Sequence, residues 1–180
     1  PAVAEGVIND EHNPKYLSDA ELDIARIDVS DDINHVVREA DIIILATPSA
    51  FLKKTLEPLT ESLIDKFIVS AIKGIIPDEY LTVAEYMNRF YDIPFSHIGI
   101  VTGPCHAEEV ALEHLSYLTV VCADPDNSEV LRAKFSTKYI RTVSSTDIYG
   151  IEYATVLKNI YAIAVGIAAG LGYGDNFIAV

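Results

Sequence analysis

From Ser30 onward, short continuous apolar runs alternate with segments whose apolar residues recur at helical spacing. The continuous runs are typical of buried strands, which we expect at 41–47, 66–72, 98–102, 118–122 and 139–143. The helical spacing predicts helices after the capping residues Ser30–Asp32, at 51–63, at 78–91 and at 127–136, and a short one from about Cys105. Strands separated by helices favour right-handed crossovers. The predicted fold class is therefore α/β, a doubly wound, Rossmann-type parallel sheet covered on both faces.

The pattern changes after Asp147. Residues 148–171 predict one long helix that is apolar nearly all round, interrupted by Glu152, Lys158 and Asn159, and such a helix is expected to be buried in a larger structure. Its continuous apolar stretch, 160–171, is shorter than the roughly twenty residues of a membrane span, so we expect no stable membrane insertion. We therefore interpret residues 1–146 as a dinucleotide-binding domain and residues 147–180 as the start of an all-helical substrate domain.

Composition narrows the possible partners. The chain has 13 lysines and arginines against 27 aspartates and glutamates, a formal net charge of −14. An acidic surface disfavours nucleic acid as a partner but is compatible with a small anionic ligand. Cys105 and Cys122 form no metal-binding or redox spacing, so we expect no metal site and a reducing, cytoplasmic location.

Three predicted strands end in unusual turns, at 47–49, 72–74 and 102–107. In open parallel sheets, ligands bind at the carboxyl ends of the strands, where these turns should meet. The third turn leads into a helix whose free N–H groups suit a phosphate or carboxylate, and Lys73 adds a cation. Together the turns predict a pocket for a small anion beside a planar cofactor. The alternative is a set of ordinary loops with a solvated lysine.

Lys158 is unusual because it lies in the middle of an apolar helix, with Ala154, Thr155 and Ala162 as its neighbours at helical spacing. Burial disfavours the charged form of a lysine, which can then act as an acid or base near neutral pH. The alternative is a lysine that reaches the surface or pairs with Asp147. Spacing alone leaves both readings open.

In their order along the chain, these motifs resemble those of bacterial NAD(P)-dependent glycerol-3-phosphate dehydrogenases. The resemblance rests on Pro48-Ser49 with Phe51, Ala71–Ile75, Gly103–Glu109, Gly150–Glu152 and Leu157–Ile160, with Asn13…Tyr16-Leu17 and Gly170–Asn176 as weaker members. It covers almost the whole chain. Any single member is weak, but the ordered set is specific.

The resemblance implies an oxidoreductase that interconverts dihydroxyacetone phosphate and sn-glycerol 3-phosphate with NAD or NADP as cofactor, supplying phospholipid synthesis. By motif position, Lys158 is the catalytic lysine. The implied substrate-binding residues are Lys73, Gly103, Cys105, Lys158 and Asn159, and the implied cofactor-binding residues are Phe51, Lys73 and Ala107. Cys105-His106 departs from the Ser/Thr-Phe that is usual there, which puts a hydroxyl contact in doubt.

The family's glycine-rich phosphate turn and later substrate ligands are expected outside residues 1–180, so these residues alone should be inactive. The partner is a small phosphorylated molecule, and a homodimer remains an open possibility. One alternative is another two-domain NAD(P)-dependent dehydrogenase, acting on a hydroxy acid or a nucleotide sugar. Another is a non-catalytic ligand-binding module, against which Lys158 argues.

Overall fold

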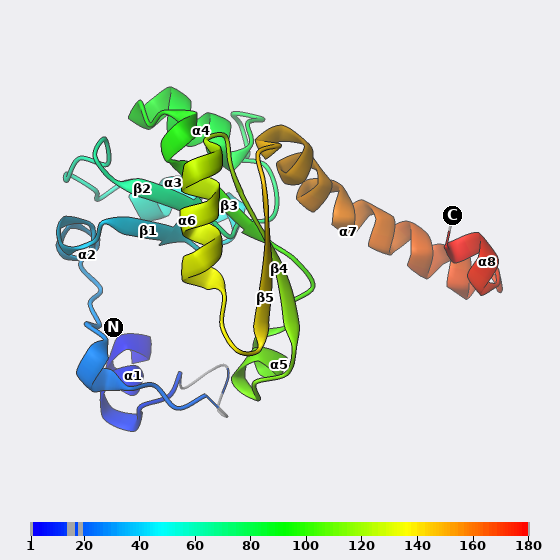
Figure 1. Cartoon of the computed structure of the whole chain (residues 1–180), viewed down its shortest axis with the longest axis horizontal. Coiled ribbons are helices and arrows are strands. Elements are labelled where there is room, and N and C mark those ends of the chain that lie inside the picture. Colours follow the sequence, from blue (N-terminus) through cyan, green and yellow to red (C-terminus); the bar gives the residue numbers. More distant parts are fainter. Residues whose placement is uncertain (1, 14–16, 18–19, 180) are drawn as a thin grey trace.

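A computed structural model describes residues 2–13, 17 and 20–179, and in this part of the chain five strands form one sheet in the order β1-β2-β3-β4-β5 (Figure 1). The strands are β1 (Ile42–Leu45), β2 (Phe67–Ser70), β3 (Ile98–Thr102), β4 (Ser116–Cys122) and β5 (Ile140–Ser145). Each strand lies within a predicted strand or overlaps one, so the predicted alternation of strands and helices is confirmed.

The helices surround this sheet. They are α1 (Ala2–Asp10), α2 (Ile33–Glu39), α3 (Ser49–Leu56), α4 (Val83–Tyr91), α5 (Ala107–Ala111), α6 (Pro125–Phe135), α7 (Ile148–Gly170) and α8 (Asp175–Ile178), with 3-10 turns η1 (Ile24–Arg26) and η2 (Phe95–His97). Helix α3 ends earlier than predicted, at Leu56, because Pro58 has no backbone N–H with which to continue the helical hydrogen bonds. Helix α4 begins later than predicted. The Thr82–Glu85 capping box starts it, and Asp78 and Tyr80 before it have positive φ angles.

The expectation of an all-parallel sheet is wrong for one strand pairing. β1, β2 and β3 are parallel, but β4 runs antiparallel to β3, and β5 is parallel to β4. A parallel return needs a crossover helix long enough to span the sheet. Between β3 and β4 the chain offers only α5, which has five residues, so it turns back instead.

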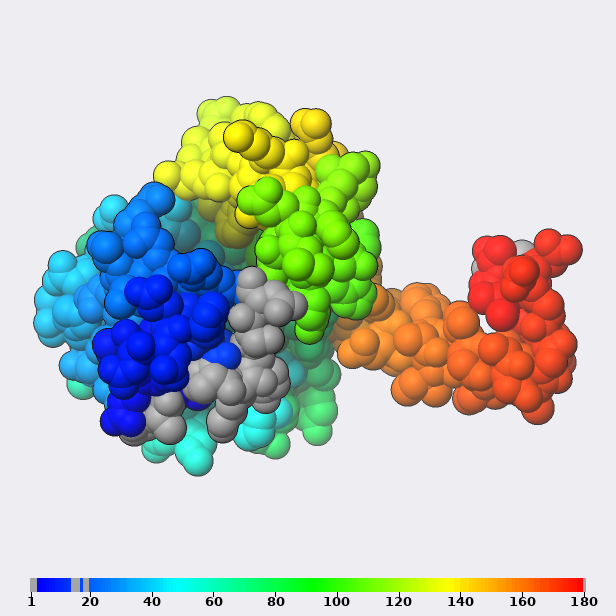
Figure 2. All heavy atoms as spheres, turned by 90° about the horizontal axis from the view of Figure 1, so that it is seen from below, coloured from blue at the N-terminus to red at the C-terminus, as the bar shows by residue number. Residues whose placement is uncertain are grey.

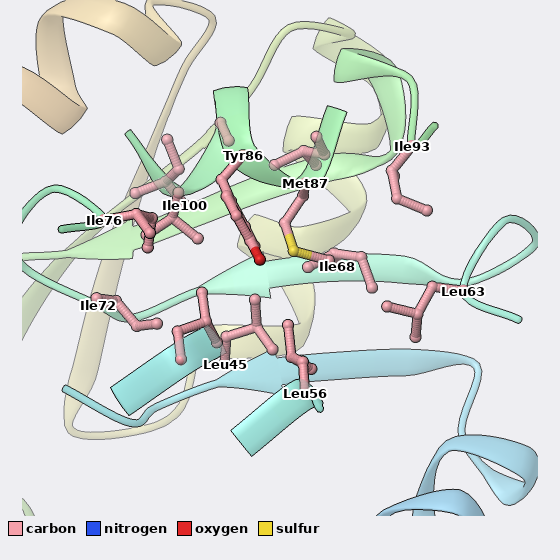
Figure 3. Close-up of a cluster of buried hydrophobic side chains, with 14 of the residues drawn as sticks. Leu45, Leu56, Leu63, Ile68, Ile72, Ile76, Tyr86, Met87, Ile93 and Ile100 are labelled. Atoms are coloured by element: carbon pink, nitrogen blue, oxygen red, sulfur yellow. The ribbon is translucent and has the colours of Figure 1, made fainter. Parts of the chain in front are cut away.

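Both faces of the sheet are covered. Figure 1 shows α6 crossing one face, with α3 and α4 on the opposite side. Among the described residues, the larger core cluster joins α3 and α4 to strand residues such as Leu45, Ile68 and Ile100, and Figure 3 shows it. Val69, Val120 and Leu131 belong to the second cluster, under α6. Successive strand residues point to opposite faces, and the two clusters confirm a doubly wound arrangement.

Helix α7 projects from the sheet as an arm that ends in α8 (Figure 2). Ile148, Glu152 and Thr155 at its start are buried, whereas Ile160 and Ile167 further along are exposed. No other described residues cover these outer turns, so the burial of this helix in a larger structure stays a prediction. By length and composition α7 could cross a membrane, a test that the core helix of a soluble protein also passes.

Candidate functional site

One row of paired residues crosses the whole sheet and sets the level of the site. Leu45 pairs with Ser70, Ser70 with Ile100, Ile100 with Val121, and Val121 with Ser145. Leu45 and Ser70 are the last residues of β1 and β2, and Ser145 is the last residue of β5. Because β5 runs antiparallel to β1 and β2, the chain leaves Ser145 in the opposite direction from Leu45 and Ser70, and α7, which begins three residues later, starts on the other side of this row.

The first two predicted turns meet at this edge. The Ala71 N–H donates to the Leu45 carbonyl at 2.9 Å, which joins the exits of β2 and β1. Gly74 has a φ angle of +133°, and a Cβ there would lie 2.9 Å from Ser49 Oγ. The chain at Gly74 therefore approaches the Ser49 turn closely, as glycine allows.

The groups on these turns fit a bound cofactor. Thr47 Oγ1 is buried and has no hydrogen-bond partner among the described residues, so it can still bond to a ligand. The Phe51 side chain is 59% exposed, and Lys73 is also exposed. An apolar ring, an unused hydroxyl and a cation are suitable groups for a planar, phosphate-bearing molecule.

The third turn lies against a different surface. A Cβ at Gly103 would come within 2.3 Å of the Tyr117 carbonyl, so this residue packs on β4. Cys105 and Ala107 line an open hollow of about 590 Å³ with Leu17 and Tyr139, among others. The structure therefore brings two turns together and places Cys105 and Ala107 in a separate hollow. Tyr16, named in the resemblance, falls outside the described residues.

The anion site predicted at the start of α5 is not supported. This helix has only five residues, and its first turn carries Glu108 and Glu109. The two carboxylates already occupy the region where the helix dipole favours negative charge. A further anion would be repelled there.

Lys158 and Asn159 are both exposed on α7. Of the readings left open for Lys158, the structure shows a lysine at the surface, because among the described residues nothing packs over this part of the helix. The Asp147 carboxylate, the other partner considered for Lys158, has a different role in the structure. Asp147 caps α7, its Oδ1 accepting from the Gly150 N–H at 2.8 Å.

The sequence reasoning missed the role of Glu152, which it treated only as an interruption of the apolar pattern. Glu152 is 5% exposed, and its Oε1 accepts a hydrogen bond from the Ala84 N–H of α4 at 3.1 Å. Burial is the main influence on this carboxyl group and raises its pKa, while the Thr82 hydroxyl and the N–H groups of Ala84 and Val83 oppose that shift. An acid in an apolar helix is as unusual as Lys158, and that was the available signal.

The raised pKa of Glu152 predicts how stability depends on pH. A carboxyl whose pKa is higher in the folded state stabilises the fold below its unfolded pKa and loses this contribution as pH rises through its folded pKa. Compared with the permanently neutral Glu152→Gln, the wild type should therefore lose free energy of unfolding from acid to neutral pH. Urea denaturation of both proteins across that range checks this. A difference that grows in favour of the wild type would contradict it and show that the N–H groups outweigh burial.

A metal centre has no support among residues 2–13, 17 and 20–179, which contain no group of three or more histidines, cysteines and acids placed to hold an ion. The residues that could bind a ligand or transfer a proton therefore lie in the turns after β1 and β2, in the hollow lined by Cys105, and on α7.

Comparison with known proteins gives a consistent family. The sequence model described as NAD-dependent glycerol-3-phosphate dehydrogenase N-terminus matches residues 1–128, and the one for the C-terminus matches residues 147–180. A glycerol-3-phosphate dehydrogenase [NAD(P)+] of Corynebacterium jeikeium is 34% identical over 98% of this chain and 53% of its own length. One of Nitratidesulfovibrio vulgaris is 36% identical with the same coverages. The chain thus spans about half the length of these relatives.

Solved structures agree. The glycerol-3-phosphate dehydrogenase of Saccharomyces cerevisiae superposes with a TM-score of 0.82 at 26% identity, over 98% of this chain and 52% of that one. That of Dunaliella salina gives a TM-score of 0.86 at 25% identity, over 99% of this chain and 31% of that one. With sequence models matched on both sides of the start of α7, the chain belongs to the NAD-dependent glycerol-3-phosphate dehydrogenase family.

Proposed function

We propose that this chain carries the cofactor-binding part and the start of the substrate domain of an enzyme that interconverts dihydroxyacetone phosphate and sn-glycerol 3-phosphate, with NAD or NADP as cofactor. The proposed domains are residues 1–146 and 147–180. A small phosphorylated substrate fits this assignment. We also predict that the enzyme supplies phospholipid synthesis and that it is located in the cytoplasm.

The observation that carries the proposal is the meeting of two turns at one edge of the sheet. The Thr47–Ser49 turn and the Lys73-Gly74 turn follow the ends of β1 and β2, and Gly74 lies close against Ser49. A sheet edge that offers unused polar groups and a cation is where an open α/β sheet binds its ligands. Helix α7, which follows β5, carries Lys158.

The roles of the residues follow from their positions in the motifs of the resemblance. The nicotinamide, when bound, supplies or accepts the hydride. Phe51, Lys73 and Ala107 would hold the cofactor, while Lys73, Gly103, Cys105 and Asn159 would hold the substrate. Of these, Cys105 and Ala107 line the separate hollow, so their roles rest on the resemblance alone. Lys158 would donate a proton to the carbonyl oxygen as the ketone is reduced, and take it back in the reverse reaction, as a general acid and base.

The direct test is an assay of the full-length protein with dihydroxyacetone phosphate and either NADH or NADPH, followed by cofactor absorbance. We expect oxidation of at least one cofactor that depends on this ketone, and little activity with dihydroxyacetone lacking the phosphate. Turnover of a hydroxy acid or a nucleotide sugar instead would overturn the proposed substrate. Absence of cofactor binding would overturn the proposed enzyme class.

Lys73→Ala should weaken substrate binding rather than the chemical step. The loss of a charge-assisted contact costs about 1.5–3 kcal/mol, so the KM for dihydroxyacetone phosphate should rise roughly 10- to 150-fold, with a smaller change in kcat. Steady-state kinetics of the full-length variant measures both. Lys54→Ala on α3, which also removes an exposed lysine, is the control and should leave KM unchanged. An unchanged KM for Lys73→Ala would make Lys73 a solvated loop residue.

A further inference from the structure

Two carboxylates cap helix α4, and they come from different parts of the chain. Glu85, within α4, accepts from the Thr82 N–H at 2.9 Å, while Thr82 Oγ1 accepts from the Glu85 N–H. This capping box satisfies two of the N–H groups that a helix start leaves free. The Ala84 N–H is satisfied instead by Glu152, which lies 68 residues further along, on α7.

Few contacts hold α7 to the sheet. Ile148 is buried in the larger core cluster, Ile151 packs against the same cluster, and the Tyr149 ring lies 5.8 Å from that of Phe95. These are apolar or ring contacts, and burial of apolar surface has no preferred direction. The Glu152–Ala84 hydrogen bond is directional, so it fixes the rotation of α7 about its own axis and its position along α4.

The burial of Glu152 is costly by itself. Its Oε2 is also buried, with no hydrogen-bond partner among the described residues. A leucine of similar size would fill the site without desolvating a carboxyl group, so the acid contributes little to stability that packing could not. Its distinct contribution is the oriented bond to α4.

We propose that Glu152 is a positioning residue for Lys158: by bonding the Ala84 N–H, it locks the first turns of α7 onto the start of α4 and so sets where Lys158 lies relative to the sheet edge. This inference rests on the proposed function of Lys158. Lys158 follows Glu152 by six residues, about 9 Å along a helix. A tilt of roughly 10° at Glu152 would move it by about 1.5 Å, and a misplacement of about 1 Å can cost about a hundredfold in rate.

The test uses variants of the full-length protein that separate packing, bonding and capping. Glu152→Leu keeps the volume and removes the acceptor, Glu152→Gln keeps an acceptor oxygen, and Glu85→Ala removes the other carboxylate that caps α4. We expect Glu152→Leu to lower kcat about 10- to 100-fold with little change in the KM of the cofactor. We expect Glu152→Gln to retain kcat within about threefold, because the bond to α4 is kept. Glu85→Ala should leave kcat unchanged.

A double-mutant cycle shows whether Glu152 acts through Lys158. In a Lys158→Ala background, Glu152→Leu should cause no further loss of kcat, because the group that it positions is already absent. A further loss of the same size would overturn the proposal. So would a normal kcat in Glu152→Leu, or a loss in Glu85→Ala as large as that in Glu152→Leu, which would make the capping of α4 the only relevant effect.

Amide hydrogen exchange provides a readout that does not depend on turnover. Glu152→Leu should speed exchange about tenfold both at Ala84 and in the first turns of α7, whereas Glu85→Ala should affect only the start of α4. Unchanged exchange in Glu152→Leu would show that the bond does not hold the two helices together. If exchange responds as expected but the wild type does not reduce dihydroxyacetone phosphate, the proposed function fails while the tie between helices stands.

Discussion

Replacing Lys158 by alanine should lower kcat of the full-length protein about a thousandfold, because a positioned general acid contributes roughly 10²–10⁴-fold. Cofactor affinity should change little, since the proposed cofactor contacts are on other elements. Lys158→Arg should not restore the rate, because a guanidinium stays protonated and cannot exchange the proton. Steady-state kinetics together with a cofactor titration measures the two effects separately.

Lys134→Ala is the matched control, because Lys134 is also an exposed lysine on a helix, at the end of α6. Its removal should leave kcat unchanged. A Lys158→Ala protein with near-normal kcat would remove the proton-donor role. A protein that loses cofactor binding to the same extent as kcat would point to a folding defect instead.

Replacing Gly103 by valine should have the largest effect on stability. Its φ angle is +150°, and a Cβ would lie 2.3 Å from the Tyr117 carbonyl and 3.0 Å from Leu118 Cα. Both neighbours are backbone atoms of β4, which pairs with β3 beside this turn, so neither can move without disturbing the sheet. Backbone strain and overpacking each cost about 1–3 kcal/mol. Their sum is a large part of the roughly 5–15 kcal/mol that stabilises a typical fold.

The measurement is the urea midpoint or Tm of Gly103→Ala and Gly103→Val, with the alanine variant less affected than the valine variant. Gly166→Ala is the control: Gly166 lies in α7, and a Cβ there would meet nothing within 4 Å. That change should leave stability the same or raise it by up to about 1 kcal/mol, since alanine favours a helix. Equal stability of Gly103→Val and the wild type would show that the β3–β4 turn rearranges freely.

The apolar pattern alone was sufficient to predict the strands and most helices. In β2, Ile68 and Val69 are fully buried in the clusters on opposite faces of the sheet, and burial on both faces gives a continuous apolar run in the sequence. The turns at Ser49 and Gly74 were also found from their residue types, and the structure confirms that these two meet. Turn residues and buried segments can be recognised in the sequence without knowing which other segments they contact.

The direction of β4, the surface contacted by Cys105 and the partner of Glu152 depended on the tertiary structure. Each is set by contacts between distant segments: α5 is too short for a crossover, Cys105 lines a hollow with Tyr139, and Glu152 bonds to Ala84 across 68 positions. The exposure of Lys158 is of the same kind, because the burial of a helix depends on what packs over it. Periodicity reports which side of a segment is apolar, whereas strand direction and the choice of partner follow from how the whole chain packs.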